Sequence, residues 1–303
     1  MKSSLVGAVD IGGTKVSVGL ADTGGNVIIE QEFPTVKGMD GADQSLKRTV
    51  HILEEQCRTL HIKVEDLLGI GVVCAGPVNV KKGTIENPYT LPGWEGYPIV
   101  DNLKKSIRLP VVLENDANGA LLGEILLKKL EKEKVLMITF GTGIGVACWE
   151  RGNVYAEGDY HPEMGHIVIA SYGENCYCRH KGCFESLCSG AALNERALRL
   201  GFRDFDHAYR GYQENNSDAD NFIRMVRTEM KAGIWNLNLI FKPDDIILGG
   251  GLMKDYFTFV SEAALEDTID NYDFVKKVRI LQSCTDKNPA LAGAAMLIKE
   301  IAN

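Results

Sequence analysis

A carboxylate and an amide stand together at the end of a short apolar run, in the sequence Val111-Val112-Leu113-Glu114-Asn115-Asp116. The run is typical of a buried strand, and apolar residues recur at helical spacing after it, so a strand leads into a helix at Asn115 and Asp116. Asn and Asp suit this position as helix caps. In an open α/β sheet, however, ligands bind outside the carboxyl ends of strands, where a carboxylate can accept a proton from a substrate hydroxyl. From these residues alone, a structural cap and a general base are both open.

Two glycine-rich turns are candidates for binding phosphate. They are Asp10-Ile11-Gly12-Gly13-Thr14-Lys15 and Gly141-Thr142-Gly143-Ile144-Gly145, and each separates two apolar segments typical of a β-hairpin. Glycine lets backbone N–H groups approach an anion, and Thr14 and Lys15 add a hydroxyl and a positive charge. Each turn alone is also explained as an ordinary hairpin turn, and Gly13 stands where a P-loop would have lysine. The pair together indicates two phosphate-binding turns.

Thiols and an imidazole gather in one short segment and indicate a zinc site. His166, Cys176, Cys178 and Cys183 supply four ligands, which would saturate a tetrahedral zinc ion and make the site structural. The alternative is a set of unligated thiols, because the Cys-x-Cys and Cys-x4-Cys spacing is not that of a common zinc finger. His180 is a competing candidate ligand. Two carboxylates flank the cluster and, if buried, would accept hydrogen bonds from the vicinal hydroxyls of a sugar; they are Glu163 and Glu185.

The elements that must position these residues form two similar halves. Each half opens with a hairpin around a glycine turn, so we interpret the chain as a duplicated α/β unit whose turns face each other across a cleft. In the first half, a strand ends in Cys74-Ala75-Gly76-Pro77, whose small residues leave room at the carboxyl edge of the sheet. The loop that contains Asn87 is either a packed surface loop or a wall that faces a sugar.

The second half adds a long helix and a third glycine-rich turn. Gly249-Gly250-Gly251 follows a short apolar strand and starts a helix, where the backbone can pass close to a nucleotide. Pro289 suits the first turn of a closing helix. We expect lobes at 1–116 and 117–288, with the helix 289–303 packing back on the first lobe. The apolar stripe of the long helix predicts core positions at Phe222, Val226, Met230, Ile234, Leu237 and Ile240.

Composition narrows the classes of function. The chain has 303 residues, 45% of them hydrophobic, which is enough for two cores. A net charge of −8 argues against a nucleic-acid partner, and no apolar stretch approaches the length that spans a membrane. The N-terminus lacks the pattern of a signal peptide. We therefore expect a cytoplasmic protein without a nucleic-acid or membrane partner, whose eight cysteines are reduced thiols or metal ligands.

The ordered set of motifs resembles the ROK family (repressors, open reading frames and sugar kinases) over almost the whole chain. The resemblance implies an α/β, two-lobed, actin-like (ribonuclease H-like) ATPase fold with a ligand cleft between the lobes. It also implies ATP- and Mg²⁺-dependent phosphorylation of a hexose hydroxyl, and a homodimer. Repressor members carry an N-terminal winged helix, whereas the first hairpin here begins at about Leu5, so the kinase branch is expected. The motifs are Asp10–Lys15, Asn115–Asn118, Gly141–Gly145, Glu163–His166, Cys176–Glu185 and Leu248–Gly251.

The resemblance also implies a role for each matching residue. Asp116 would be the base that takes the sugar hydroxyl proton, Asp10 would help to position magnesium, and His166 would bind the sugar and, through its other ring nitrogen, zinc. The positions expected at the sugar are Gly76, Asn87, Asn115, Asp116, Glu163, His166 and Glu185. The positions expected at the nucleotide and its magnesium ion are Asp10, Gly12, Gly13, Thr14, Lys15, Gly141, Thr142, Gly143, Gly145, Gly250 and Gly251.

Several positions depart from the usual family pattern. Arg179 replaces a glycine in the cysteine loop, His161-Pro162 replaces Ala-Gly, and Tyr89 replaces a second Asn after Asn-Pro. Gly145-Val146-Ala147 and the segment Glu185–Gly190 resemble the allose kinase branch more than the glucokinase branch. D-Allose is therefore the expected sugar, and glucose, fructose or an N-acylhexosamine are the alternatives within the family. A sugar-sensing regulator, against which the intact Asp116 argues, and a structural ATPase, against which the zinc loop argues, are the alternatives of other classes.

Overall fold

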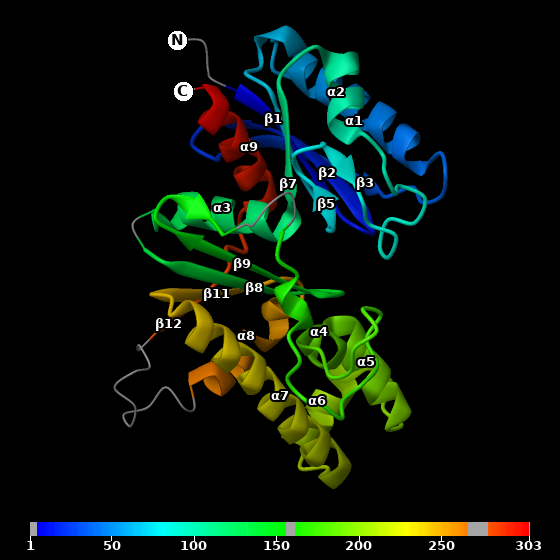
Figure 1. Ribbon diagram of the computed structural model, residues 1–303, viewed down its shortest axis with the longest axis vertical. Helices are drawn as coiled ribbons and strands as arrows, with labels where there is room; N and C mark the ends of the chain where they lie inside the picture. Colours follow the sequence, from blue (N-terminus) through cyan, green and yellow to red (C-terminus); the bar gives the residue numbers. More distant parts are fainter. Residues whose placement is uncertain (1–4, 132, 156–160, 266–277, 303) are drawn as a thin grey trace. The chain divides into compact units, whose positions relative to one another are not determined.

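The computed structural model describes residues 5–131, 133–155, 161–265 and 278–302, and the chain divides into two compact units (Figure 1). The first unit comprises Met1–Lys132, Arg151–Pro162 and Cys284–Asn303, and the second comprises Glu133–Glu150 and Glu163–Ser283. Helix α3 (Asp116–Lys128) therefore belongs to the first unit, whereas the lobe boundary predicted from the sequence lies after residue 116. The physical reason is that α3 packs along the C-terminal helix α9 (Pro289–Ala302).

The first unit is built on a sheet with strand order β3-β2-β1-β4-β7. Strands β1 and β2 form the antiparallel hairpin predicted around the first glycine turn, and β1, β4 and β7 run parallel. In the register of these parallel strands, Ile11 lies opposite Cys74 and Cys74 opposite Asn115, so their carboxyl ends meet at one edge of the sheet. The strand bounds are β1 Leu5–Ile11, β2 Lys15–Asp22, β3 Val27–Pro34, β4 Ile70–Cys74 and β7 Val111–Asn115, with the separate hairpin β5 Val78–Asn79 and β6 Thr84–Ile85.

Helices cover both faces of this sheet. Helices α1 (Gly41–Thr59) and α2 (Ile99–Ile107) bury their apolar residues with one face of the strands in a single core, and the short helix η1 (Val64–Asp66) follows α1. Helix α9 packs on the other face, where Ala295 and Ile298 contact Val6 and Ala21. Pro289 is the first residue of α9, as predicted for a proline in a first helical turn.

The second unit repeats the strand pattern of the first. Strands β8 and β9 form an antiparallel hairpin, and β8, β11 and β12 run parallel, in the order β9-β8-β11-β12. An antiparallel hairpin followed by two parallel strands is also the arrangement of β2-β1-β4-β7, so the predicted duplication is confirmed. The strand bounds are β8 Val135–Phe140, β9 Ile144–Glu150, β11 Asp245–Gly249 and β12 Arg279–Gln282. The short strand β10 (Asn153–Val154) belongs to the residues of the first unit.

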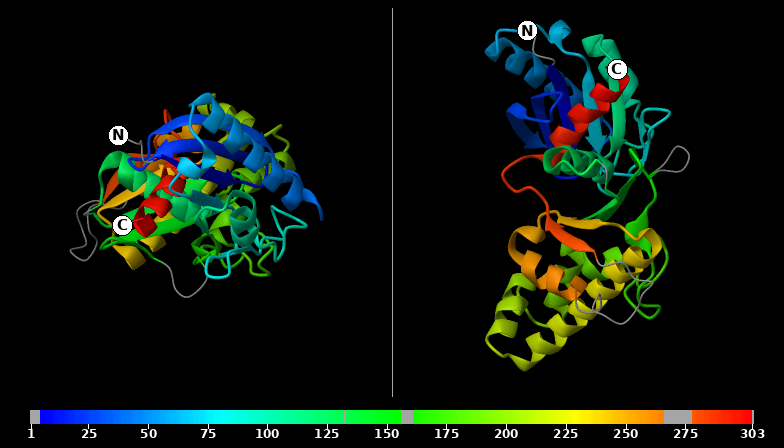
Figure 2. Two further views of the ribbon diagram at one scale, coloured as in Figure 1. Left: turned by 90° about the horizontal axis from the view of Figure 1, so that it is seen from above. Right: turned by 90° about the vertical axis from the view of Figure 1, so that its left-hand side faces the viewer.

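The helices of the second unit share one apolar core with β8, β9 and β11. Helix α7, yellow in Figures 1 and 2, lies beside α8, drawn in orange tones. The predicted stripe of α7 is buried with one exception, because Ile240 near its C-terminal end is 64% exposed. No helix within the described ranges combines the length and apolar character needed to span a bilayer. The helix bounds are η2 Met164–His166, α4 Phe184–Cys188, α5 Gly190–Arg199, α6 Phe205–Gln213, α7 Ser217–Phe241 and α8 Met253–Leu265.

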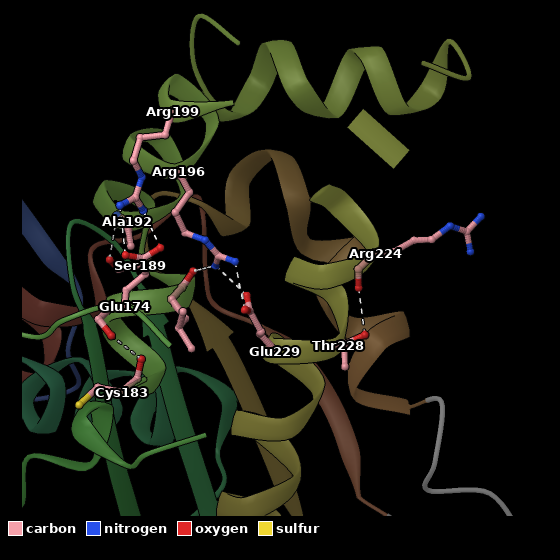
Figure 3. A network of polar contacts seen from close by, with 11 residues as sticks. Glu174, Cys183, Ser189, Ala192, Arg196, Arg199, Arg224, Thr228 and Glu229 are labelled. Atoms are coloured by element: carbon pink, nitrogen blue, oxygen red, sulfur yellow. Dashed lines mark hydrogen bonds and ion pairs between the residues drawn. The ribbon is translucent and has the colours of Figure 1, made fainter. Parts of the chain in front are cut away.

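Two arginines of α5 connect this helix to its neighbours (Figure 3). Arg196 is buried, and its guanidinium donates to the Leu187 carbonyl at the end of α4 (2.6 Å) and to both carboxylate oxygens of Glu229 in α7 (2.6 and 3.0 Å). Arg199 forms a bidentate pair with Glu174 in the cysteine loop (2.7 and 3.1 Å). These contacts hold α4, which carries Glu185, against α5 and α7.

Candidate active site

Asn115, and not Asp116, is the residue whose side chain caps helix α3. The Asn115 side chain is the N-cap of α3, since its Oδ1 accepts hydrogen bonds from the backbone N–H groups of Ala117 (2.9 Å) and Asn118 (3.3 Å). Asp116 is the first residue of the helix, and its carboxylate accepts hydrogen bonds from the Ala117 N–H (2.9 Å) and from its own backbone N–H. Capping by Asn115 leaves the Asp116 carboxylate available at the carboxyl end of β7.

Three titratable groups gather at the carboxyl ends of β1, β4 and β7. Burial raises the pKa of Asp116 to about 6, against the hydrogen bond from Ala117, which lowers it. Burial, and then the negative charge of Asp116, raise the pKa of Asp10 to about 7, while Lys15 acts in the opposite sense. Burial and the charges of Asp116 and Asp10 also raise the pKa of the Cys74 thiol. The edge of this sheet therefore concentrates negative charge.

The first glycine turn is held by contacts from strand β3 and the residue after it. The Gly12 N–H donates to the Lys15 carbonyl (2.9 Å), and the Thr35 hydroxyl donates to the Gly12 carbonyl (2.7 Å). Thr14 is exposed, and the Lys15 ammonium pairs with Glu32. The backbone of the turn is thus fixed, while the positive charge expected at a phosphate is already paired with a carboxylate.

Asn87 organises its own loop. Its side chain is fully buried, and its Nδ2 donates to the carbonyls of Ala75 (3.1 Å) and Gly76 (2.6 Å) and to the Thr90 hydroxyl (2.7 Å). Its Oδ1 accepts from the N–H groups of Tyr89 (2.9 Å) and Thr90 (3.0 Å). Asn87 and Gly76 therefore fix the segment that follows β4, and the Asn87 amide is satisfied within it.

The second glycine turn is bonded to helices α4 and α5. Glu185 in α4 accepts a hydrogen bond from the Ile144 N–H (2.7 Å), and the Gly190 N–H at the start of α5 donates to the Gly141 carbonyl (2.8 Å). A Cβ atom at Gly143 would lie 2.4 Å from the Glu185 carboxylate, so any larger residue would displace this carboxylate from its present position. The turn and the Glu185 carboxylate form one structure, with Thr142 exposed.

The third glycine turn packs against the end of β8, next to the second. Gly250 adopts φ 88°, and a Cβ atom there would lie 2.4 Å from the Phe140 carbonyl oxygen. The Leu252 N–H donates to the same oxygen (3.0 Å), whereas the space around Gly251 is open. Because Phe140 immediately precedes Gly141, the structure brings together the two segments of this unit that were expected at the nucleotide.

Four metal-ligating side chains converge in the cysteine loop. One ligand atom from each of His166, Cys176, Cys178 and Cys183 lies within 4.8 Å of the others. The Cys176 Sγ is 3.4 Å from the His166 Nδ1, and the Cys178 Sγ is 3.5 Å from the Cys183 Sγ. His180 is exposed and is not part of this group. Three thiols and one imidazole at such distances suit a tetrahedral zinc ion.

The other ring nitrogen of His166 faces a tyrosine of the same loop. The His166 Nε2 lies 3.0 Å from the Tyr177 hydroxyl, and the two rings meet edge to face with centroids 4.9 Å apart. Burial, the charge of Glu185 and a hydrogen bond with Glu185 raise the pKa of Tyr177. The charge of Glu163, which is exposed, acts in the same sense. Tyr177 thus lies among the groups of this unit that were expected to hold a sugar.

Residues 6–301 of the chain match the ROK family. The chain belongs to the ROK family. It is 30% identical over 268 residues to a glucokinase from Halalkalibacterium halodurans, covering 81% of this chain and 80% of that protein. The crystal structure of a ROK hexokinase from Thermus thermophilus is 26% identical with a TM-score of 0.84, covering 99% of this chain and 100% of the other. A ROK family glucokinase from Streptomyces griseus in complex with glucose and AMPPNP is 25% identical with a TM-score of 0.75, covering 98% and 99%. These likenesses confirm the predicted α/β, two-lobed, actin-like ATPase fold.

The residues expected at the site of this ROK chain fall in both units. Asp10, the first glycine turn, Gly76, Asn87, Asn115 and Asp116 belong to the first unit. The second and third glycine turns, Glu163, His166, Glu185 and the three cysteines belong to the second unit. Within the first unit, Asp10 lies near Asp116, and Asn87 is enclosed in its own loop. Within the second unit, Glu185 contacts the second glycine turn, and His166 lies with the three cysteines.

Three residues that contact this site were not singled out from the sequence. Tyr177 stands between Cys176 and Cys178, two of the candidate metal ligands, and this position in the sequence was a usable signal. Glu32, which pairs with Lys15, and Thr35, which holds the turn at Gly12, depend on the register of β2 with β3. No local pattern predicts that register to the residue.

Proposed function

We propose that this ROK sugar kinase transfers the γ-phosphoryl group of ATP to a hydroxyl of a hexose, with Asp116 as the general base. The supporting observation is the position of the Asp116 carboxyl group, which is partly buried at the end of β7 and has a pKa raised to about 6. A carboxylate with this pKa is largely ionised at neutral pH, yet it accepts a proton more readily than an exposed aspartate. Both properties suit a base that acts on an alcohol.

In the proposed reaction, Asp116 orients the sugar hydroxyl and takes its proton. The sugar oxygen forms a bond to the γ-phosphorus, the bond from that phosphorus to the β,γ-bridging oxygen breaks, and a sugar phosphate and ADP result. Positioning and neutralisation of charge supply most of the catalysis in phosphoryl transfer. The cap supplied by Asn115 contributes to positioning because it fixes the helix turn that carries Asp116.

Polar side chains that can exchange hydrogen bonds with a sugar would hold its hydroxyls. Asn115 uses its Oδ1 in the cap, which leaves its Nδ2 group to donate. Glu163, His166 and Glu185 supply two carboxylates and a ring nitrogen, and such groups discriminate strongly between a substrate that pairs with them and one that does not. Asn87 donates hydrogen bonds to the backbone carbonyls of Ala75 and Gly76, so Asn87 and Gly76 would stabilise the adjoining loop instead of binding the sugar directly.

The glycine turns would bind the nucleotide. Gly141, Thr142, Gly143 and Gly145 lie beside Gly250 and Gly251 at the end of β8, where backbone N–H groups can approach phosphate oxygens. The first turn, Gly12 to Lys15, would supply further backbone contacts.

Asp10 would help to hold Mg²⁺. Its fit to a cation is supported by the neighbouring Asp116 charge, which makes protonation or cation binding at Asp10 favourable. When bound, magnesium neutralises phosphate charge.

We also propose a structural zinc ion at His166, Cys176, Cys178 and Cys183. The four protein ligands would fill a tetrahedral shell and leave no open position for substrate. Elemental analysis of protein purified without added metal should find one zinc ion per chain, and its absence would contradict the assignment. The homodimer implied by the family is a further proposal, which light scattering tests directly.

D-Allose is the proposed sugar, on the resemblance of Gly145-Val146-Ala147 and Glu185–Gly190 to the allose kinase branch. The test is ADP release with Mg-ATP across a panel of hexoses and N-acylhexosamines. Asp116→Asn should lower kcat about 10²- to 10⁴-fold while sugar affinity stays within a few-fold. Asp101→Asn, an exposed position in α2, is the matched control. Normal turnover by Asp116→Asn would contradict the base assignment, and sugar binding without turnover by the unaltered protein would favour a sensor.

A further inference from the structure

The hydroxyl of Tyr177 lies between two groups to which the proposed function assigns a sugar. Its oxygen is 3.0 Å from the His166 Nε2, and it also forms a hydrogen bond with the Glu185 carboxylate. The edge-to-face contact of the His166 and Tyr177 rings fixes their mutual orientation. Both Tyr177 and His166 come from the segment that contains the four metal ligands.

The direction of these hydrogen bonds follows from the surroundings of His166. Its Nδ1 faces the three cysteines, with the Cys176 Sγ at 3.4 Å, so Nδ1 is the nitrogen available to a metal ion. With the proposed zinc ion on Nδ1, the remaining ring proton would be on Nε2, which would then donate to the Tyr177 oxygen. The Tyr177 O–H in turn donates to Glu185, which already accepts from the Ile144 N–H (2.7 Å).

A sugar hydroxyl has the same hydrogen-bonding pattern as this phenol. It accepts one hydrogen bond and donates one, so it can take the place of Tyr177 between a ring N–H donor and a carboxylate acceptor. The residue Tyr177 is 53% exposed, which means that most of its ring is not locked in a core. Its side chain can therefore leave this position without opening an apolar cavity.

We propose that the Tyr177 hydroxyl occupies the place of a sugar hydroxyl between His166 and Glu185 in the sugar-free protein and leaves it when the sugar binds. The inference rests on the proposed sugar-binding roles of His166 and Glu185. When a side chain of the protein occupies its own ligand site, the apparent Kd equals the intrinsic Kd divided by the fraction of molecules in which the site is open. Tyr177 therefore sets sugar affinity by competition.

The test compares sugar affinity by calorimetry in the unaltered chain, Tyr177→Phe and Tyr172→Phe. Tyr177→Phe keeps the ring but removes the competing hydroxyl. We expect its apparent Kd for the substrate, the unmodified hexose that the chain phosphorylates, to fall about 3- to 10-fold. Tyr172 belongs to the same loop region and is 100% exposed, so Tyr172→Phe should leave Kd unchanged. Equal zinc content in the three proteins shows that the loop is preserved.

The outcomes separate this inference from the proposed function. Absence of phosphorylation of any hexose by the unaltered chain overturns the proposed function, whereas the Kd ratio between Tyr177→Phe and the unaltered chain tests the competition. A Kd that stays within twofold or rises in Tyr177→Phe overturns the competition. If the unaltered chain binds no hexose, binding that appears in Tyr177→Phe supports it, and binding by neither protein overturns it.

Discussion

The carboxyl groups of Asp10 and Asp116 lie close enough for the negative charge of Asp116 to raise the pKa of Asp10. They come from β1 and the start of α3 after β7, and β4 separates these two strands in the sheet. Protonation and cation binding both relieve the repulsion between them. The ionisation of these two neighbouring carboxyl groups should therefore affect both the stability of the first unit and the rate of the proposed reaction as the pH changes.

The rate of sugar phosphorylation should fall as Asp116 becomes protonated. A general base must be ionised, and the pKa of Asp116 is about 6, so kcat/KM should rise tenfold per pH unit well below pH 6 and level off above about pH 7. The measurement is kcat/KM from pH 5 to 8.5 at saturating Mg-ATP. A profile that is flat over this range would exclude Asp116 as the base.

Asp10→Asn should stabilise the first unit at alkaline pH. A carboxyl group whose pKa is raised by folding, here from 3.8 to about 7, binds its proton more tightly in the folded state. It therefore opposes folding above about pH 7, and this cost disappears as the pH falls toward 4. Because Asp10 is partly exposed, we expect a gain in unfolding free energy of about 1–2 kcal/mol at pH 8.

The check is the difference in urea-induced unfolding between the two proteins at pH 8 and at pH 5, without nucleotide or magnesium. The gain from Asp10→Asn should shrink at pH 5. Asp101→Asn, at an exposed position, supplies the control and should show no such pH-dependent gain. A stabilisation that is the same at both pH values would mean that the charge of Asp10 is not its cause.

Much of the fold follows from local patterns, because alternating and helical apolar spacing directly reflects burial. The paired hairpins, the junction of strand and helix at Asp116, and the first residue of α9 at Pro289 were all predictable in this way. The boundary after residue 116 was not, since the place of α3 is decided by α9, which comes from the far end of the chain. The exposure of Ile240 was not predictable either. The apolar periodicity of α7 continues to its C-terminal end, but the hydrophobic core of the second unit does not extend that far.

Some candidate site residues could be identified from the local sequence, whereas the contacts of others depend on the tertiary fold. Residue type and position at a strand end pointed to Asp116, and ligand spacing pointed to the cysteine loop. The enclosure of Asn87 could not be foreseen, because an amide in a loop can serve either a ligand or its own backbone, and only the fold of the loop decides. The pairing of Lys15 with Glu32 likewise depends on a contact between neighbouring strands.

Arg179→Gly should stabilise the cysteine loop. Arg179 adopts φ 74°, a left-handed conformation that costs a residue with a side chain about 1–2 kcal/mol and glycine very little. Glycine also increases the entropy of the unfolded chain, so the expected net gain is about 0.5–1 kcal/mol. The Arg179 side chain is exposed, so its loss removes no packing.

Thermal unfolding and chelator competition for zinc measure this effect. Arg179→Gly should raise Tm by about 1–2 °C and bind zinc at least as tightly as the unaltered chain. Lys181→Gly changes an exposed residue of the same loop that does not have a positive φ, so it should be neutral or destabilising. Equal effects of the two substitutions would rule out relief of left-handed strain at Arg179.

Arg196→Ala should weaken both the second unit and its binding of sugar. The Arg196 and Glu229 side chains are only 6% and 15% exposed, so removing the arginine leaves a buried carboxylate and deprives the Leu187 carbonyl of its donor. Such a loss costs about 3–5 kcal/mol. Arg199→Ala is the matched control on the same helix, because its pair with Glu174 is 49% and 38% exposed and should contribute at most about 1 kcal/mol.

Leu187 lies two positions after Glu185 in α4, so a shift of this helix also moves the carboxylate assigned to the sugar. Arg196→Ala should therefore raise the KM for the sugar, whereas Arg199→Ala should leave it nearly unchanged. Urea denaturation gives the stability of each variant, and initial rates over a range of sugar concentrations give KM. If Arg196→Ala lowers stability but leaves KM unaltered, the ion pair supports the fold of the second unit without positioning Glu185.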